Sequence, residues 1–561
     1  MSGCALPLKE RDDFMEKRSL LAMALSAGVI FLYYTFFFKP PSPPPAVLPL
    51  PVASETESSP HAKEKELVAP EKKSVSVPEN KTPRLPLQQT SIDTSLYQAR
   101  LSSEGGILES FRVKGYRETT AKNSPFVDLF ATSPDQNLSL EFREANFSLP
   151  EKMDFEVLQA GTHSVEYRWK SPEILLSKKI NWDENNYSAH VKVSVENLSD
   201  KSLQGSLGLR LESRQHVHKG GGWGFLKAPE NLKYPVLYPE KGIVRHPDVK
   251  ELPQKTEEKG LFQWAGLEDQ YFLWAIVSRA LSSETRVEYG WREENILYSE
   301  LFYPKEIFAP ASKLEKEFTL YVGPKDIEHL KILGVHLEDS VDYGWFSVVA
   351  HPILFLLKFF HRWVGNWGVA IILLTVFIKL ILHPVNKKTL ESMKAMQKLQ
   401  PKLVEIREKY KNDKERLNVE MMNLFKTHKV NPMGGCLPML LQMPVYIALY
   451  KVLYNAIELY HAPFFWFYKD LSAPDPYFIS PVLLGVFMVL QQKMTPSTYQ
   501  DPAQAKMMLF MPIMFSAFML FLPSGLVIYI FVNTLMTVIQ QYTHQHDLSL
   551  ADLLKKRFKP A

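Results

Sequence analysis

One lysine lies well inside an apolar stretch of the sequence. Residues 365–384 read GNWGVAIILLTVFIKLILHP and are almost entirely apolar, and about 20 helical residues suffice to cross a bilayer. Lys379 lies within this stretch, and Thr375 precedes it by one helical turn, so that both side chains share a face. An ammonium group near the middle of a bilayer costs about 2.5–3.5 kcal/mol. The pair therefore predicts a polar site inside the membrane, and the alternative is a lysine that snorkels to the interface.

Other polar residues occur in the apolar stretches that follow, and none of them is acidic. They are Gln442, Ser516, Asn533, Thr534 and Thr537. Proton- or sodium-coupled transporters usually hold carboxylates in the membrane, and a nucleotide-driven motor needs a phosphate-binding loop, so the sequence disfavours both classes. Methionines are frequent in the same stretches, including Met443 and Met514. They form either ordinary membrane core or a flexible surface for varied apolar partners.

Six apolar stretches predict six transmembrane helices, with both chain ends and all the basic loops on the cytoplasmic side. They are residues 19–38, 365–386, 433–453, 478–495, 507–522 and 525–541. The first follows a basic segment, residues 1–18, and is longer than the apolar part of a signal peptide, so we interpret it as an uncleaved anchor. Residues 340–363 form a further apolar stretch with a basic stripe, which is typical of an amphipathic helix in the membrane interface.

A linker and a large domain separate the first two transmembrane stretches. Residues 40–91 are rich in Pro, Ser, Glu and Lys, which predicts a disordered tether. Residues 92–335 contain short alternating runs, such as 190–196, separated by turn signals, and these predict a β-sandwich on the outer side of the membrane. Tryptophans in this domain indicate either a packed core or a sugar-binding cleft. No pair of carboxylates or group of histidines in it suggests a catalytic site, and we do not expect an enzyme.

Residues 387–430 are highly charged and net basic, and they carry apolar residues at helical spacing on both sides of Lys411–Asp413. This pattern predicts a cytoplasmic hairpin of two helices. The hairpin has one of two roles. It fixes the membrane topology and does nothing else, or it docks a ribosome or a targeting factor. The basic residues that we expect in docking are Lys398, Lys402, Arg407, Lys414 and Arg416. The tail, residues 542–561, is also basic.

Charge and cysteine content exclude further classes. A net charge of +4 over 561 residues gives no general attraction for DNA. The two cysteines, Cys4 and Cys436, are far apart, which excludes a disulfide framework and a metal site of the CxxC type. We therefore expect no metal and no cofactor.

Several motifs resemble the family of YidC-type membrane protein insertases. They are NWG at 366–368 with Thr375, Lys379 and the His-Pro pair at 383–384, SVDYGWF at 340–346, NPMGGCLPMLLQMPVYIALY at 431–450, and LPSGLVIYIFVNTLMTVIQQ at 522–541. The resemblance extends over the whole chain and is most specific in its second half. It implies an inner-membrane α-helical protein with a five-helix insertase core, plus a periplasmic all-β sandwich domain like that of Gram-negative members.

The resemblance also implies a function: insertion and folding of nascent membrane proteins, alone or beside the Sec translocon, in the lipid bilayer. A cation in a groove would receive the polar outer segment of the client while the client's apolar segment slides along two helices. We expect the groove residues to be Lys379, Thr375, Gln442, Asn533 and Tyr529, and the slide residues to be Met443, Pro444, Tyr446, Met514 and Phe518. Lys379 replaces the arginine usual in the family, and Ile530 interrupts the usual aromatic pair after Tyr529.

Two other functions remain open from the residues alone. One is a channel or transporter for a small anion around Lys379. The other is a membrane assembly scaffold whose β-domain binds partners and whose groove is inert.

Overall fold

The computed structural model describes eleven segments of the chain: residues 86–130, 137–150, 153–215, 232–249, 252–279, 282–293, 295–428, 430, 437–465, 468–495 and 502–546. The predicted anchor at 19–38, the segment before it, nearly all of the linker and the end of the tail lie outside these residues. Both cysteines also lie outside them.

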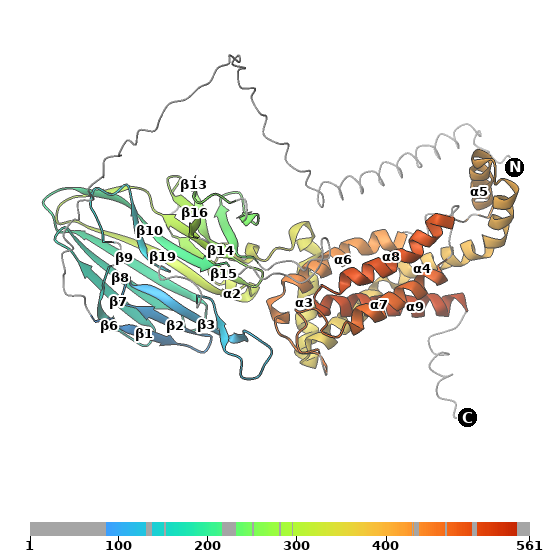
Figure 1. The fold of residues 1–561 in the computed structure, drawn as a ribbon, viewed down its shortest axis with the longest axis horizontal. Coiled ribbons are helices and arrows are strands. Elements are labelled where there is room, and N and C mark those ends of the chain that lie inside the picture. Colours follow the sequence, from blue (N-terminus) through green and yellow to red (C-terminus); the bar gives the residue numbers. More distant parts are fainter. Residues whose placement is uncertain are drawn as a thin grey trace, which may run out of the picture. The chain divides into compact units, whose positions relative to one another are not determined.

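The first part of the chain forms a domain of antiparallel strands, the β-domain (Figure 1). Its strands are β1 (Gln89–Asp93), β2 (Tyr97–Ser102), β3 (Ile107–Arg117), β4 (Phe126–Asp128), β5 (Leu140–Arg143), β6 (Glu156–Ala160), β7 (Ser164–Lys170), β8 (Ile174–Trp182), β9 (Ser188–Asn197), β10 (Leu203–Arg214), β11 (Tyr234–Pro239), β12 (Val244–Arg245), β13 (Thr256–Lys259), β14 (Phe262–Glu268), β15 (Phe272–Ser278), β16 (Arg286–Glu293), β17 (Ile296–Phe302), β18 (Glu306–Phe308) and β19 (Lys313–Pro324). The domain begins three residues before the expected boundary at 92, because Gln89–Asp93 pairs with β2 along its whole length.

The strands form three sheets, and two of them pack on each other as the predicted sandwich. A nine-stranded sheet has the order β12-β11-β14-β15-β19-β9-β8-β7-β6, and a six-stranded sheet has the order β13-β16-β17-β10-β18 with β5 beside β10. Strands β14 and β15 of the large sheet contact β10 and β17 of the smaller one. Trp264 and Trp274 are fully buried, so these two tryptophans are core residues and do not line a cleft.

The second part of the chain is helical. Its helices are α2 (Ile327–Lys331), α3 (Ser347–Val364), α4 (Trp367–Lys409), α5 (Lys414–Thr427), α6 (Leu437–Asn455), α7 (Ile479–Met494), α8 (Pro502–Met519) and α9 (Ser524–Gln545). Figure 1 shows α6, α7, α8 and α9 running together as a bundle with the first part of α4. Compared with the predicted spans, α8 begins and ends a few residues earlier, and α9 extends four residues further.

Among the described helices, three are long and apolar enough to cross a membrane: Gly344–Val364, Trp367–Lys409 and Ser524–Gln545. Helix α7 and the part of α8 at Leu509–Met519 are apolar but shorter. The described residues therefore contain membrane-spanning candidates at two of the expected places, 365–386 and 525–541. The third candidate, Gly344–Val364, coincides with the predicted interfacial helix, and the count of six spans stays a prediction.

The motif GNWG makes the sharp connection between α3 and α4. Gly365 ends α3 with φ = +64°, a left-handed conformation that glycine adopts without strain. Asn366 then caps α4, because its side-chain oxygen accepts a hydrogen bond of 3.1 Å from the Val369 N–H. Its amide group donates at 3.0 Å to the carbonyl of Phe464, whose ring packs over Gly368 where a Cβ atom would be. The motif thus fixes where the long helix begins.

Helix α4 is one continuous helix of 43 residues and runs through residue 386, the predicted end of the transmembrane segment. Pro384 lies inside this helix and does not end it. A proline removes one backbone hydrogen bond, and packing of the turns on either side can hold the helix together. Figure 1 shows α4 continuing beyond the bundle to the turn before α5. The predicted groove lysine and the first arm of the predicted hairpin therefore belong to the same helix.

The hairpin of α4 and α5 has its own small core, as the apolar spacing predicted. Met396, Leu399 and Leu403 of α4 pack with Leu417, Met421 and Phe425 of α5. The chain turns at residues 410–413, and Asp413 caps α5 by accepting a hydrogen bond from the Arg416 N–H. The predicted turn at Lys411–Asp413 is confirmed.

Leu403→Ala is expected to open this hairpin. Leu403 is fully buried, and removing a buried leucine side chain costs about 2–5 kcal/mol, a large share of what so small a core supplies. Amide hydrogen exchange of α5 in the full-length protein measures the effect. Val404→Ala is the matched control, because Val404 is exposed and its truncation is expected to leave exchange unchanged. Equal exchange in both variants would show that the hairpin does not depend on this core.

Candidate functional site

The candidate site is a buried polar cluster where α4, α6 and α9 meet. Lys379 on α4 is only 3% exposed, and its Nζ donates a hydrogen bond of 2.8 Å to Oγ1 of Thr537 on α9. Thr537 in turn donates at 2.7 Å to the backbone carbonyl of Asn533, one turn earlier on α9. Because the Thr537 hydroxyl donates its own proton to the Asn533 carbonyl, its oxygen can accept the hydrogen bond from the Lys379 ammonium group.

The cluster continues from Asn533 to α6. The side-chain oxygen of Asn533 accepts a hydrogen bond of 2.9 Å from Nε2 of Gln442, and its amide group donates to the hydroxyl of Tyr446. The Tyr446 ring meets the ring of Tyr529 edge-on, with centroids 5.7 Å apart. Three helices that are far apart in the sequence thus place Lys379, Thr537, Asn533, Gln442 and Tyr446 in one hydrogen-bonded chain.

The structure brings together most of the predicted groove residues but leaves one of them apart. Thr375 is buried, yet its hydroxyl donates at 2.7 Å to the carbonyl of Ile371 on its own helix. Thr537, which we did not place in the groove, is the direct partner of Lys379. The spacing of Asn533 and Thr537, one helical turn apart on an apolar helix, was the signal that could have identified it.

The chemistry of the cluster is that of one cation among neutral polar groups. Within the described residues, no carboxylate lies within ion-pair distance of Lys379. Burying an ammonium group without a counter-ion is unfavourable unless hydrogen-bond acceptors or an incoming anion compensate. The site can therefore bind an acidic group. In the described part of the chain, no group of three metal-binding side chains occurs.

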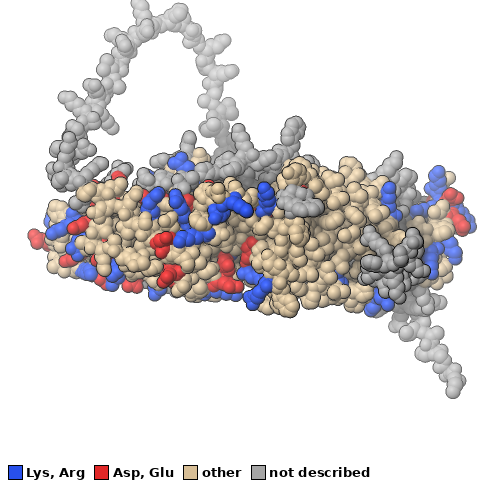
Figure 2. Space-filling view, turned by 90° about the horizontal axis from the view of Figure 1, so that it is seen from below, with Lys and Arg blue, Asp and Glu red and all other residues tan. Residues whose placement is uncertain are grey.

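The predicted slide residues fall into two sets. Met443, Met514 and Phe518 are 36%, 51% and 40% exposed, so they belong to the apolar surface of the bundle. Tyr446 instead joins the polar cluster, and Pro444 beside it is half-buried. On the face drawn in Figure 2, charged side chains gather on the β-domain and on the hairpin, while the helical bundle shows almost none. Such an apolar surface suits contact with lipid or with an apolar segment of another chain.

The predicted docking residues lie on the hairpin. Lys398, Lys402 and Arg416 are exposed, and Arg407 is half-buried. Lys402 contacts His428 at 3.2 Å, and Arg416 forms an ion pair of 3.5 Å with Asp413. Lys414 begins α5, but its side chain is not among those described. Three of the five cations are thus available to a partner.

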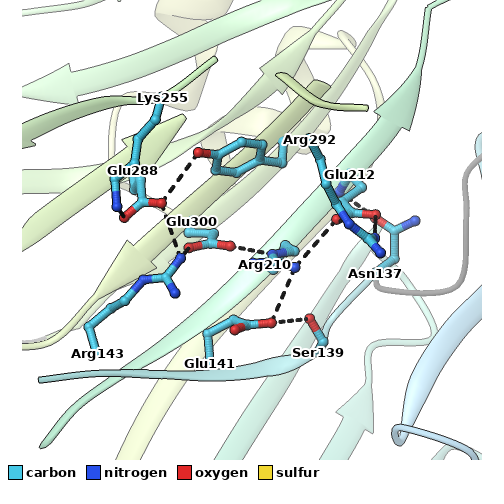
Figure 3. A network of polar contacts seen from close by, with 11 residues as sticks. Asn137, Ser139, Glu141, Arg143, Arg210, Glu212, Lys255, Glu288, Arg292 and Glu300 are labelled. Atoms are coloured by element: carbon cyan, nitrogen blue, oxygen red, sulfur yellow. Dashed lines mark hydrogen bonds and ion pairs between the residues drawn. The ribbon is translucent and has the colours of Figure 1, made fainter. Parts of the chain in front are cut away.

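A second polar cluster, in the β-domain, was not expected from the sequence. Arg210, Glu300 and Glu288 lie opposite one another on β10, β17 and β16. Figure 3 shows Glu300 between Arg210 and Arg143, and the latter guanidinium also reaches Glu288, with nitrogen-to-oxygen distances of 3.2 and 3.1 Å to the two acids. Nearby, Arg292 contacts both oxygens of the buried Glu212 at 3.1 Å. Each buried carboxylate has a cation, which is typical of a structural network.

Burial affects the carboxylates of this network unequally. It raises the pKa of Glu300 to about 7, and Glu141 and Glu288 add to the shift while Arg210 and Arg143 oppose it. Burial also raises the pKa of Glu212, against the effect of Arg292 and Arg210. For Glu288, burial is outweighed by Lys255 and Arg143, and its pKa is lowered. Glu300 is therefore a member of the network whose charge changes near neutral pH.

Glu300→Gln is expected to flatten part of the pH dependence of stability. Since the folded state raises the pKa of Glu300 from 4.5 to about 7, this group's contribution is fully present below pH 4.5 and is lost as the pH rises through 7. The melting temperature of the full-length native protein, relative to that of the variant, should fall over this range. Lys178→Met is the control, because burial lowers the pKa of Lys178 from 10.5 to about 7 and its contribution changes only above that pH. A constant difference between native protein and Glu300→Gln from pH 4.5 to 7 would contradict the prediction.

Comparisons with known proteins agree with these two regions. The family model "YidC periplasmic domain" matches residues 89–356, and "60Kd inner membrane protein" matches residues 359–550. The membrane protein insertase YidC of Geobacter sulfurreducens is 38% identical over 552 residues, which cover 96% of this chain and 100% of that protein. The membrane protein insertase YidC of Syntrophus aciditrophicus is 38% identical over 558 residues, covering 94% and 99%.

Solved structures also show similarity to this chain. The crystal structure of an active YidC insertase with its first transmembrane domain resolved matches with a TM-score of 0.35 and 18% identity, over 82% of this chain and 95% of that one. The two relatives, matched at 38% identity over nearly their whole length, are decisive: the chain belongs to the YidC family of membrane protein insertases.

Proposed function

We propose that this protein inserts nascent membrane proteins into the inner membrane by receiving their polar outer segments at the cluster around Lys379. The observation that carries the proposal is the single buried cation with neutral polar partners and, among the described residues, no counter-ion. Moving a polar segment through hydrocarbon leaves its backbone and charges without partners. A groove at the cluster shortens that path, and its cation attracts acidic residues in a medium of low dielectric constant.

The apolar surface beside the cluster serves the client's membrane-spanning segment. Met443 on α6 and Met514 and Phe518 on α8 present flexible or aromatic side chains that adapt to different sequences. As the client leaves this surface for the lipid, burial of its apolar area supplies about 25 cal/mol per Å². No nucleotide or cofactor is required by this scheme, and insertion proceeds down the free-energy gradient of the client itself.

The family and the charge distribution support a membrane topology for the remaining parts of the chain. The β-domain lies in the periplasm, six spans cross the inner membrane, and both termini are cytoplasmic. Helix α3 lies in the outer interface: Val348, Phe355 and Trp363 are 83%, 70% and 77% exposed along one apolar stripe, while Ile353 and Leu357 face the protein. The exposed cations of the hairpin dock a ribosome or targeting factor, and the bundle works alone or beside the Sec translocon.

The test uses full-length protein in liposomes and a small client with one transmembrane segment and a short acidic outer tail. Protection of the tail from added protease measures insertion, and empty liposomes give the background. Insertion well above background supports the proposal. If the tail stays accessible while a small anion such as chloride passes the membrane only in the presence of the protein, the protein is an anion channel. If neither occurs, it is a scaffold.

A further inference from the structure

A depression on the nine-stranded sheet of the β-domain gathers cations that have no assigned role. It has a volume of about 380 Å³ and is lined by residues of β8, β9 and β19 and by the residue that follows β15. The lining residues are Lys179, Asn181, His190, Val191, Lys192, Arg279, Glu317 and Phe318. Three of them carry a fixed positive charge and one carries a negative charge, so the depression is net positive.

Two of the cations in this depression lie outside ion-pair distance of any described carboxylate, although Glu166 on β7 is the cross-strand partner of Lys179. Among the described residues, neither Lys179 nor Arg279 forms an ion pair with a carboxylate. Lys192 differs, since it contacts Glu315 at 2.7 Å. Lys179 and Lys192 are direct partners on β8 and β9, an arrangement in which like charges destabilise the strand pair. The residues that line the depression therefore carry a net positive charge, only partly offset by Glu317 and by Glu166 beside it, which an anionic ligand would reduce.

Arg279 is also oriented in advance. Its Nε donates a hydrogen bond of 3.1 Å to Oγ1 of Thr319, and one Nη lies 3.3 Å from Nδ1 of His190. His190 and Thr319 are themselves cross-strand partners, 3.2 Å apart through the same atoms. The guanidinium is thus held on one side by Thr319 and His190, and its remaining N–H groups can donate to the two oxygens of a carboxylate.

We propose that this depression binds an acidic segment of polypeptide, with one carboxylate at Arg279 and a second at Lys179. In the sheet the strands follow the order β15, β19, β9, β8, so the two cations lie three strand spacings apart, roughly 14 Å at their backbones. An extended chain covers this distance in about four residues, which matches acidic residues at positions i and i+4. Between the two cations lie Glu317 on β19 and Lys192 on β9, which are cross-strand partners, while the side chains of Val191 and Phe318 are buried on the core side of the sheet.

The spacing and the charges favour a polypeptide over a single small anion. One phosphate group would have to draw two side chains together from opposite sides of the depression, and the carboxylate of Glu317 on the strand between them would repel a dianion more than a monoanion. That the natural ligand is the acidic outer segment of a client after insertion rests on the proposed function. Binding of acidic polypeptide itself does not depend on it.

The experiment measures binding of a fluorescent peptide to the full-length protein in detergent at low salt. The peptide has two glutamates at i and i+4 in a neutral Gly, Ser and Gln sequence, and a second peptide has glutamine at both positions. The double variant Lys179→Gln, Arg279→Gln is compared with the native protein and with Lys201→Gln, Lys241→Gln, which removes two exposed lysines of the β-domain away from the depression. Inorganic phosphate is added as a competitor, and client insertion by each variant is measured separately.

The acidic peptide is expected to bind the native protein and the control variant alike, and the Lys179, Arg279 variant at least about tenfold more weakly. The glutamine peptide should not bind. Equal binding to both double variants, or equal binding of both peptides, would overturn the site, and displacement by phosphate at concentrations comparable to the peptide would show a simple oxyanion site instead. If the native protein binds the acidic peptide but inserts no client, the proposed function fails while the site stands.

Discussion

Lys379→Ala is expected to reduce insertion of a client with an acidic outer tail to nearly the level of empty liposomes. Lys379 is the only charged member of the cluster formed with Thr537, Asn533, Gln442 and Tyr446, as far as the described residues show. A unit charge at about 4 Å contributes about 4 kcal/mol at the effective dielectric constant of a partly buried site. Since 1.4 kcal/mol corresponds to a factor of ten, the insertion rate should fall at least tenfold.

Two further variants separate charge from shape at this position. Lys379→Met keeps nearly the volume of the side chain but removes the charge, and it should be as inactive as Lys379→Ala. Lys379→Arg keeps the charge and should insert the client, because a guanidinium can donate to Thr537 as the ammonium group does. Protease protection of the tail in liposomes measures all three, after gel filtration has shown that each variant is folded.

The client offers a second control. A tail in which all acidic residues are replaced by asparagine or glutamine should insert equally well with native protein and with Lys379→Met, since the cation then has no charged group to attract. If all variants insert the acidic client alike, the apolar surface of the bundle carries insertion and the lysine does not take part.

Members of the buried polar cluster around Lys379 could be predicted from the sequence because polar residues are rare in membrane-spanning stretches. A lysine inside an apolar stretch stands out, and so do Gln442 and Asn533, which the structure joins by a hydrogen bond of 2.9 Å. Which polar residues meet could not be predicted, since the rotation of each helix about its axis depends on packing with its neighbours. Thr375 shares a face with Lys379 but bonds its own backbone, whereas Thr537 reaches the lysine from α9.

The β-domain was predictable as a class of fold but not in its details. Alternation in runs such as Ser188–Asn197 indicates strands, because one face of a sheet is buried. Arg210 and Glu212 alternate with apolar residues along β10, yet Glu212 is fully buried and contacts Arg292 from β16. Strand order decides which polar face is covered, and short alternating runs hold little information about strand order.

Arg210→Ala is expected to destabilise the β-domain by about 3–5 kcal/mol, the usual cost of removing one partner of a buried ion pair. Arg210 contacts Glu300 through Nε and approaches Glu141 and Glu212 through Nη1, at 3.3 and 3.6 Å. Without it the fully buried Glu300 keeps only Arg143, which it shares with Glu288. Urea unfolding of the full-length protein in detergent at pH 8, followed by tryptophan fluorescence, measures the loss at a pH where Glu300 is ionised.

The matched control and a rescue variant show whether charge is the cause. Arg168→Ala removes an exposed strand arginine and should change stability by no more than about 0.5 kcal/mol. The double variant Arg210→Met, Glu300→Gln leaves no unpaired charge in the buried row, so it should recover most of the stability that Arg210→Ala loses. If the double variant is as unstable as Arg210→Ala, packing of the arginine side chain stabilises this sheet, and the ion pairs do not. If it is as stable as the native protein, the network sets the pH response of the domain while adding little to its stability.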